Sequence, residues 1–141
     1  MSSRSKSTLF LIEQLIVVAV FAICATACIR ILTNAYFYAV DARDTSNALH
    51  AAESGAESFK AVSGDFRKAA ELLGGTVGIV DGADALIVYF DESWQAGGES
   101  GAAFVLRLVD GRQAAQLFSG SLSVERVTGE ELVSFPVAVR R

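Results

Sequence analysis

One uninterrupted apolar segment, Leu9 to Ile29, restricts the fold of this chain more than any other feature. Its 21 residues contain one acidic side chain, Glu13, and no basic one. A helix rises about 1.5 Å per residue, so the segment spans about 32 Å, enough to cross the hydrocarbon core of a bilayer. A carboxylate in such a segment costs about 2.5–3.5 kcal/mol on insertion, and we therefore expect Glu13 to have a partner or a function.

The residues before the apolar segment carry Arg4 and Lys6 and no acid, which favours a cytoplasmic N-terminus with the rest of the chain outside. Three alternatives share this layout. They are a signal peptide cut after Ala25-Thr26-Ala27, a lipoprotein signal ending at Cys28, and an uncleaved or differently cleaved membrane anchor. Glu13 and the neighbouring Gln14 are unusual for a signal peptide, and no flexible Ser/Gly linker follows the segment. These two observations favour an anchor.

The helical pattern continues beyond the apolar segment. From Arg30 to Val62 there is no proline and only one glycine, Gly55. The composition favours helix, and the aromatic run 36–38 suits a membrane–water boundary or packing on a folded domain. We predict one helix over residues 9–62, with 9–29 in the membrane. Small and apolar residues recur on one predicted face: Leu32, Ala35, Ala39, Ala42, Leu49, Ala52, Ala56 and Phe59.

The pattern changes to short strands after residue 63. Asp65 is placed to cap a short helix over Phe66–Leu73, which ends at Gly74-Gly75. Pro136 cannot donate to a ladder, so the last strand should be an edge strand or bulged there. We predict strands at Thr76–Val80, Leu86–Phe90, Ala103–Val109, Gln116–Arg126 and Leu132–Arg140, separated by Gly-containing turns.

These elements predict an α+β fold in which a long N-terminal helix packs on an antiparallel sheet of four or five strands. The predicted organisation is a basic leader over 1–8, the long helix over 9–62 and an extracytoplasmic head over 63–141. From Ile31 onward there are nine Lys or Arg and fifteen Asp or Glu, which argues against nucleic-acid binding by a basic face. Both cysteines, Cys24 and Cys28, lie in the apolar segment, so the head has no disulfide framework.

The segment Leu9–Val20, LFLIEQLIVVAV, resembles the N-terminal segment of type IV pilins and pseudopilins. That family has a short basic leader, a cut before an apolar residue, and a glutamate five residues into the mature chain. The resemblance covers about residues 4–30 in sequence, and the remainder in architecture only. It implies that a prepilin peptidase cuts between Thr8 and Leu9 and methylates the new amino group. It further implies that Glu13 pairs with the N-terminus of a neighbouring subunit.

The chain departs from the family at the cut, because the family normally has Gly at the position of Thr8 and Phe at that of Leu9. An uncut leader would keep Arg4 and Lys6 and would prevent the amine–carboxylate pair.

The resemblance implies a structural subunit of a type IV pilus-like, type II secretion or competence filament, and a minor pseudopilin in particular. Its partners would be the membrane, other pilins or pseudopilins, a prepilin peptidase and an assembly platform protein. The protein would be a single-pass membrane protein with its head outside. The alternative, from another functional class, is a signal-anchored or lipidated extracellular binding domain that works alone.

No arrangement of residues predicts an enzyme or a cofactor. His50 is the only histidine, and no cysteine or second histidine accompanies it to form a metal set. We expect Trp94, in the loop 93–101, to pack over the sheet edge rather than to form an exposed binding tip. Calcium-binding loops occur in some pseudopilins, but the spacing of the loop acids here matches no calcium loop, and we expect solvated charges. Those acids are Asp81, Asp84, Asp91, Glu92 and Glu99.

Overall fold

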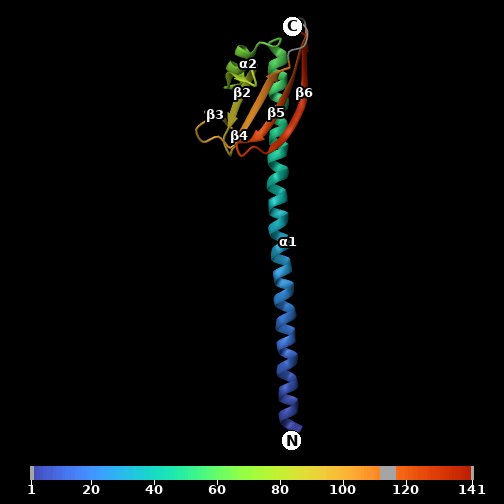
Figure 1. Ribbon diagram of the computed structural model, residues 1–141. Coiled ribbons are helices and arrows are strands. Elements are labelled where there is room, and N and C mark those ends of the chain that lie inside the picture. Colours follow the sequence, from blue (N-terminus) through green and yellow to red (C-terminus); the bar gives the residue numbers. More distant parts are fainter. Residues whose placement is uncertain (1, 112–116, 141) are drawn as a thin grey trace. The chain divides into compact units, whose positions relative to one another are not determined.

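The computed structural model describes residues 2–111 and 117–140, with side chains from residue 6 onward (Figure 1). The chain forms two units, one up to Ala42 and one from Arg43 onward, which are described separately below. The two helices are α1 (Ser2–Ala61) and α2 (Phe66–Leu73). The strands are β1 (Thr76–Val80), β2 (Ala83–Phe90), β3 (Ala96–Gly97), β4 (Phe104–Asp110), β5 (Leu117–Arg126) and β6 (Glu131–Arg140).

The predicted long helix is confirmed, and it begins earlier than expected. α1 starts at Ser2, so the leader residues from 2 to 8 are helical as well. It ends at Ala61. Shortly after this end, Ser63 and Gly64 adopt positive φ values of 55° and 81°. The Gly64 amide then donates to the Phe59 carbonyl at 3.0 Å, which satisfies a carbonyl in the last turn.

The short helix α2 forms where the local signals predict it. The Asp65 side chain accepts from the Arg67 and Lys68 amides at 3.0 and 3.2 Å, which satisfies two donors of the first turn. At the other end Gly74 takes the left-handed conformation, with φ at 67°, and its amide donates to the Ala70 carbonyl. Both helix boundaries therefore follow from residues adjacent in sequence.

The strands form one antiparallel sheet in the order β1-β2-β4-β5-β6, and β3 pairs with β2 outside this path. The five predicted strands are confirmed, with end positions in the described residues that differ by up to three residues; Gln116, the first residue of the fourth predicted strand, lies outside the described residues. β2 begins at Ala83 rather than Leu86, because Asp81 and Gly82 both have positive φ and form a tight hairpin that pairs Val80 with Ala83. The two-residue β3 lies inside the loop predicted over 93–101.

The last strand is an edge strand, as Pro136 predicts. β6 pairs only with β5 along the sheet path, and Pro136 lies opposite Ser121. The sheet does contain an irregularity in this pair, but it lies between Val124 and Glu125 and not at Pro136. A proline is tolerated where its missing N–H would face away from the neighbouring strand.

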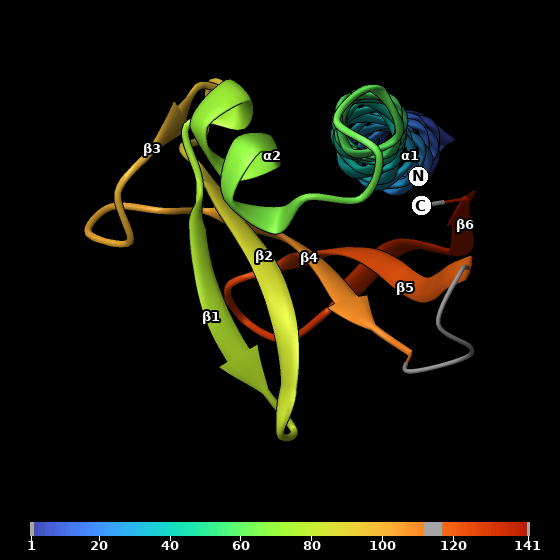
Figure 2. The same cartoon turned by 90° about the horizontal axis from the view of Figure 1, so that it is seen from above.

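The core of the second unit lies between one face of the sheet and the two helices. Figure 2 shows α2 above β2 and the end of α1 above the same face of the sheet. Phe59, Phe66 and Phe118 form an aromatic cluster, with ring centroids of Phe59 and Phe118 4.6 Å apart. Gly55 permits the close approach of α1, since an added Cβ would lie 3.0 Å from Leu106 Cδ1.

The predicted apolar face of α1 is partly correct. Ala52, Ala56 and Phe59 are buried in the core, but Leu49 is 43% exposed and Ala48 takes its place. One residue turns a helix by about 100°, so the predicted phase was wrong at this point. The upstream members of the predicted face belong to the first unit and are exposed: Leu32, Ala35, Ala39 and Ala42.

Candidate functional site

The apolar part of α1 is exposed along its whole length within the first unit. Leu9 is 64% exposed, Leu15 70% and Phe21 74%. Among the described residues, α1 is the one helix long and apolar enough to be a candidate membrane span, and its most apolar window has no buried residue. An exposed apolar surface of this extent marks contact with lipid or with other chains.

Two threonine hydroxyls of the first unit are satisfied by the helix itself. The Thr26 hydroxyl donates to the Ala22 carbonyl at 2.8 Å, and the Thr33 hydroxyl donates to the Ile29 carbonyl at 2.9 Å. These bonds leave no hydroxyl hydrogen in need of water, so both residues are compatible with an apolar environment.

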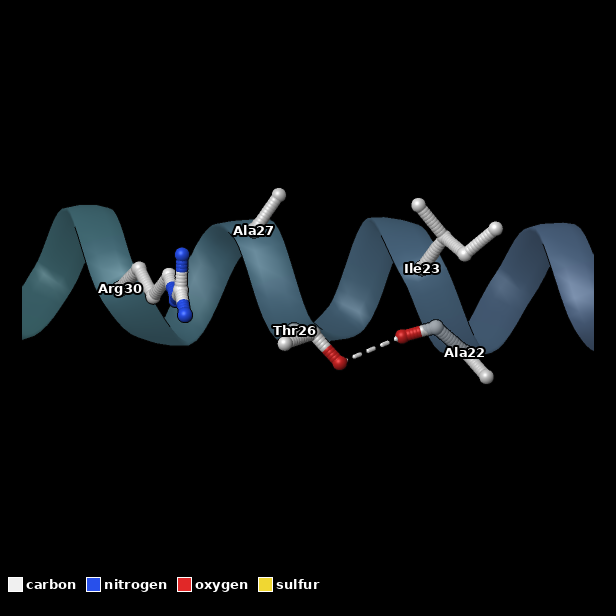
Figure 3. A pocket seen from close by; sticks show the side chains of 5 residues that line it. All are labelled: Ala22, Ile23, Thr26, Ala27 and Arg30. Atoms are coloured by element: carbon white, nitrogen blue, oxygen red, sulfur yellow. Dashed lines mark hydrogen bonds between the residues drawn. The ribbon is translucent and has the colours of Figure 1, made fainter.

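Small side chains reduce the diameter of α1 in the middle of the apolar segment. Figure 3 shows a shallow depression lined by Ala22, Ile23, Thr26, Ala27 and Arg30, with the Thr26 hydroxyl turned to the Ala22 carbonyl. In membranes, small residues four apart allow helix backbones to approach closely. The shape of this depression suits the packing of a second helix.

Aromatic residues follow Arg30 on the same helix. Tyr36, Phe37 and Tyr38 are 68%, 62% and 75% exposed. Their exposure is typical of a belt at the membrane–water boundary.

Glu13 lies within this exposed apolar surface. Ile12 before it and Leu15 after Gln14 are more than half exposed, so the carboxylate has no protein core around it. The described residues provide no ion-pair partner for it. Thr8 and Leu9, at the predicted cut, lie within the same helix, and Leu9 is one turn from Glu13. The geometry thus puts the predicted processing and assembly residues on one continuous helix.

The second unit, from Arg43 onward and called the head from here on, brings together no group of metal-ligating side chains among its described residues. His50 is exposed, and its Nδ1 lies 3.8 Å from Glu53 Oε2. No group of three or more His, Cys, Asp or Glu side chains meets in the ranges 2–111 and 117–140. Asp91, one of the loop acids, has a structural role: its Oδ1 accepts from the Ser93 amide at 2.8 Å and the Gln95 amide at 3.0 Å.

Trp94 packs on the sheet, as expected. Its ring stacks on Phe104 with centroids 4.1 Å apart, and Phe90 lies 5.9 Å away. The residue has a positive φ of 60°, and the Asp91 turn holds it in this conformation. The indole Nε1 is buried and has no hydrogen-bond partner. Trp94 therefore contributes to the core and is not an exposed binding tip.

An ion-pair cluster on the head was not predicted. Arg126 Nη2 lies 2.8 Å from Asp44 Oδ2, and its Nη1 lies 2.6 Å from Glu130 Oε2. A third pair joins Arg107 and Glu125 at 2.8 Å beside a cavity of about 220 Å³. Because carboxylates already engage both guanidinium groups, the cluster fits a structural role better than anion binding.

No family model, curated protein or solved structure matches this chain. Within α1 the strongest feature is Glu13, a carboxylate on an exposed apolar helix.

Proposed function

We propose that this protein is a structural subunit of a membrane-anchored filament of the type IV pilus or pseudopilus kind, assembled through α1. The observation that carries the proposal is the exposure of Glu13 among apolar side chains that are themselves exposed. A helix with this surface has to be covered by lipid, by other helices or by both. Copies of the chain provide that cover if their helices bundle.

The carboxylate makes the bundling specific. Two charges are costly to remove from water, and their attraction repays the cost only when they meet in good geometry. Removing one partner of a buried pair costs about 3–5 kcal/mol, which is enough to select one stagger of neighbouring helices over others. In this proposal the apolar side chains drive association, and Glu13 sets its position.

The resemblance to pilins suggests which proteins would process and assemble this chain. A prepilin peptidase would cut between Thr8 and Leu9, and the freed amine would be available to the Glu13 carboxylate of a neighbouring subunit. The subunit would be a minor pseudopilin that meets other pilins or pseudopilins and an assembly platform protein. Its acidic head, from Arg43 onward, would form the outer surface or tip of the filament.

The first test is the variant Glu13→Ala, followed by the amount of protein recovered in filaments or sedimentable assemblies. We expect incorporation to be blocked, because the pair that fixes the stagger is lost. Gln14→Ala is the matched control, since it removes the adjacent polar side chain about 100° around the helix. Assembly of the Glu13→Ala protein at the wild-type level would refute the proposed role.

A second test addresses processing. Mass spectrometry of the native protein should find an N-terminus at methylated Leu9. An N-terminus at Met1 or Ser2 would refute the predicted cleavage. The proposed role of α1 as a membrane anchor would be unaffected. Such a terminus would also show that Thr8 does not replace the family's glycine at the cut.

A tethered extracellular binding domain is the second candidate function. It is favoured by Thr8 at the predicted cut and by Cys28, which follows Ala25-Thr26-Ala27 and has a free, exposed thiol. A lipid attached to Cys28 would establish the lipoprotein form of this candidate. Labelling with a fatty-acid analogue, with Cys28→Ala as control, distinguishes the two candidates.

A further inference from the structure

Lys6 and Glu13 are opposite charges on one side of α1. Both are exposed and lie in the same unbroken helix. Seven residues correspond to a rise of about 10.5 Å and to a net turn of only about 20°, so the two side chains are almost in line along the axis. Lys6 belongs to the basic residues that precede the apolar segment, and Glu13 lies within that segment.

The two charges do not pair within the chain. Side chains three or four residues apart are neighbours on a helix, whereas these two are separated by two turns. Among the residues whose side chains are described, no ion pair involves either one. The positions three and four residues from Glu13 are all apolar: Leu9, Phe10, Ile16 and Val17.

We infer that a second copy of this chain docks on this side of α1, parallel and displaced by seven residues, so that its Lys6 ammonium meets Glu13. The inference rests on the proposed function and deepens it by naming the partner of Glu13 while the leader is in place. If the cut at Leu9 is made, Lys6 is lost and the new amine is the remaining candidate partner. The Lys6 pair therefore belongs to the uncut chain.

The displacement follows from charge and from the membrane together. Copies in one membrane share an orientation, and with no displacement they would place Glu13 beside Glu13 and Lys6 beside Lys6. A displacement of seven residues replaces both repulsions with an attraction. The contact is unsymmetrical, because one copy contributes Glu13 and the other contributes Lys6 from the same side of α1.

Arg30 is the cation that follows the segment, and distance excludes it as a partner. It lies seventeen residues after Glu13, a rise of about 25 Å, which is most of the bilayer core of about 30 Å. Such a displacement would leave only about a fifth of the apolar segment at membrane depth. A displacement of about 10.5 Å keeps about two thirds of it there.

Charge exchange tests the pairing directly. The full chain is placed in phosphatidylcholine vesicles, and the variants Lys6→Glu, Glu13→Lys and the double variant are compared by chemical cross-linking between copies. Each single reversal should lower the oligomer yield about tenfold or more, and the double variant should recover it to within about twofold, because the pair re-forms with its charges exchanged. Lys6→Arg should keep the yield, and protease access to the head confirms equal orientation.

A thiol test fixes the displacement independently. With a shift of seven residues, position 17 of one copy faces Cys24 of the next. In a Cys28→Ala background, Val17→Cys should therefore give disulfide-linked dimers on mild oxidation. Positions 17 and 24 are too far apart on one helix to bond within a chain. Leu15→Cys, on the opposite side of the helix, is the matched control and should give none.

The outcomes separate this inference from the proposed function. If Lys6→Glu has no effect, or the double variant does not recover, the Lys6 pair is wrong. In that case a Glu13→Ala variant that still fails to assemble would leave the proposed function standing with another partner. If neither Lys6→Glu nor Glu13→Ala changes association, both the pair and the filament role are refuted.

Discussion

The two units of this protein differ in whether they bury their large apolar side chains. Phe21, in the unit up to Ala42, is 74% exposed, whereas Phe59, in the unit from Arg43, is completely buried. Both residues lie in α1. The second unit buries its apolar residues between a sheet and two helices, but the first contains only a helix and has no second layer to bury against.

This difference indicates what each unit requires. A single helix gains little stability from its own backbone in water, and most helices are stabilised by packing on one apolar face. In the first unit apolar side chains surround the helix, so lipid or other helices must provide the packing. The second unit carries its own core and should not need either.

The largest effect should come from separating the units. A chain that starts at Arg43 keeps the core and the Asp44–Arg126 ion pair, so we expect it to be folded, monomeric and absent from membranes. The full chain should be found in the membrane fraction. Fractionation and circular dichroism measure both properties. A head that stays with the membrane, or that unfolds, would contradict the division into self-sufficient and dependent units.

Phe59→Ala should show the next largest effect. Removing a fully buried phenylalanine that contacts two other rings should lower the free energy of unfolding of the head by about 3–5 kcal/mol. Denaturant unfolding followed by the fluorescence of Trp94, the only tryptophan, measures the change. Phe21→Ala is the matched control, and it should leave the unfolding of the head unchanged. Equal effects of the two substitutions would remove the contrast between the units.

The Arg126 cluster should contribute less than the aromatic core. The Arg126 and Asp44 side chains are 24% and 19% exposed, so Arg126→Leu leaves carboxylates partly desolvated and should cost about 1.5–3 kcal/mol. Arg107→Leu breaks a pair whose arginine is 39% exposed, and we expect about 0–1 kcal/mol. The same unfolding assay compares them. A larger effect for Arg107 would reverse the assigned order.

At the start of α2 we expect a smaller effect than that of Arg126→Leu. Asp65→Ala removes the acceptor for two backbone amides and should lower the free energy of unfolding by about 1 kcal/mol. Asp65→Ser keeps a capping oxygen and should recover most of the loss. If the serine variant is as unstable as the alanine variant, Asp65 acts through something other than its cap.

The sequence predicted best what depends on adjacent residues. The cap at Asp65 and the turn at Asp81-Gly82 follow from local chemistry, and the apolar segment follows from composition alone. Predictions that depended on which side of a helix faces the core were less accurate. Placing Leu49 instead of Ala48 in the core is an error of one residue, and only the position of the sheet decides between them.

Contacts between distant residues could not be predicted from one sequence. Asp44 and Arg126 are 82 positions apart, and no local pattern links them. The strand β3 was missed because two residues in a glycine-rich loop carry no periodic signal. Glu13 was recognised as a candidate site because its surroundings are apolar. The partner of Glu13 could not be predicted in the same way, because a contact between molecules gives no local pattern in the sequence. Only the spacing between Lys6 and Glu13 points to it.

In the proposed assembly the helices of neighbouring copies lie against each other, and Glu13 sets this contact. Cys24 and Cys28 are free, exposed thiols on that helix, so oxidation of the native protein in its own membrane reports contact between copies. We predict disulfide-linked dimers or larger species that disappear in Glu13→Ala and in a Cys24→Ala, Cys28→Ala double variant. Monomers alone in the wild-type protein, or cross-linking that is unchanged by Glu13→Ala, would contradict the account.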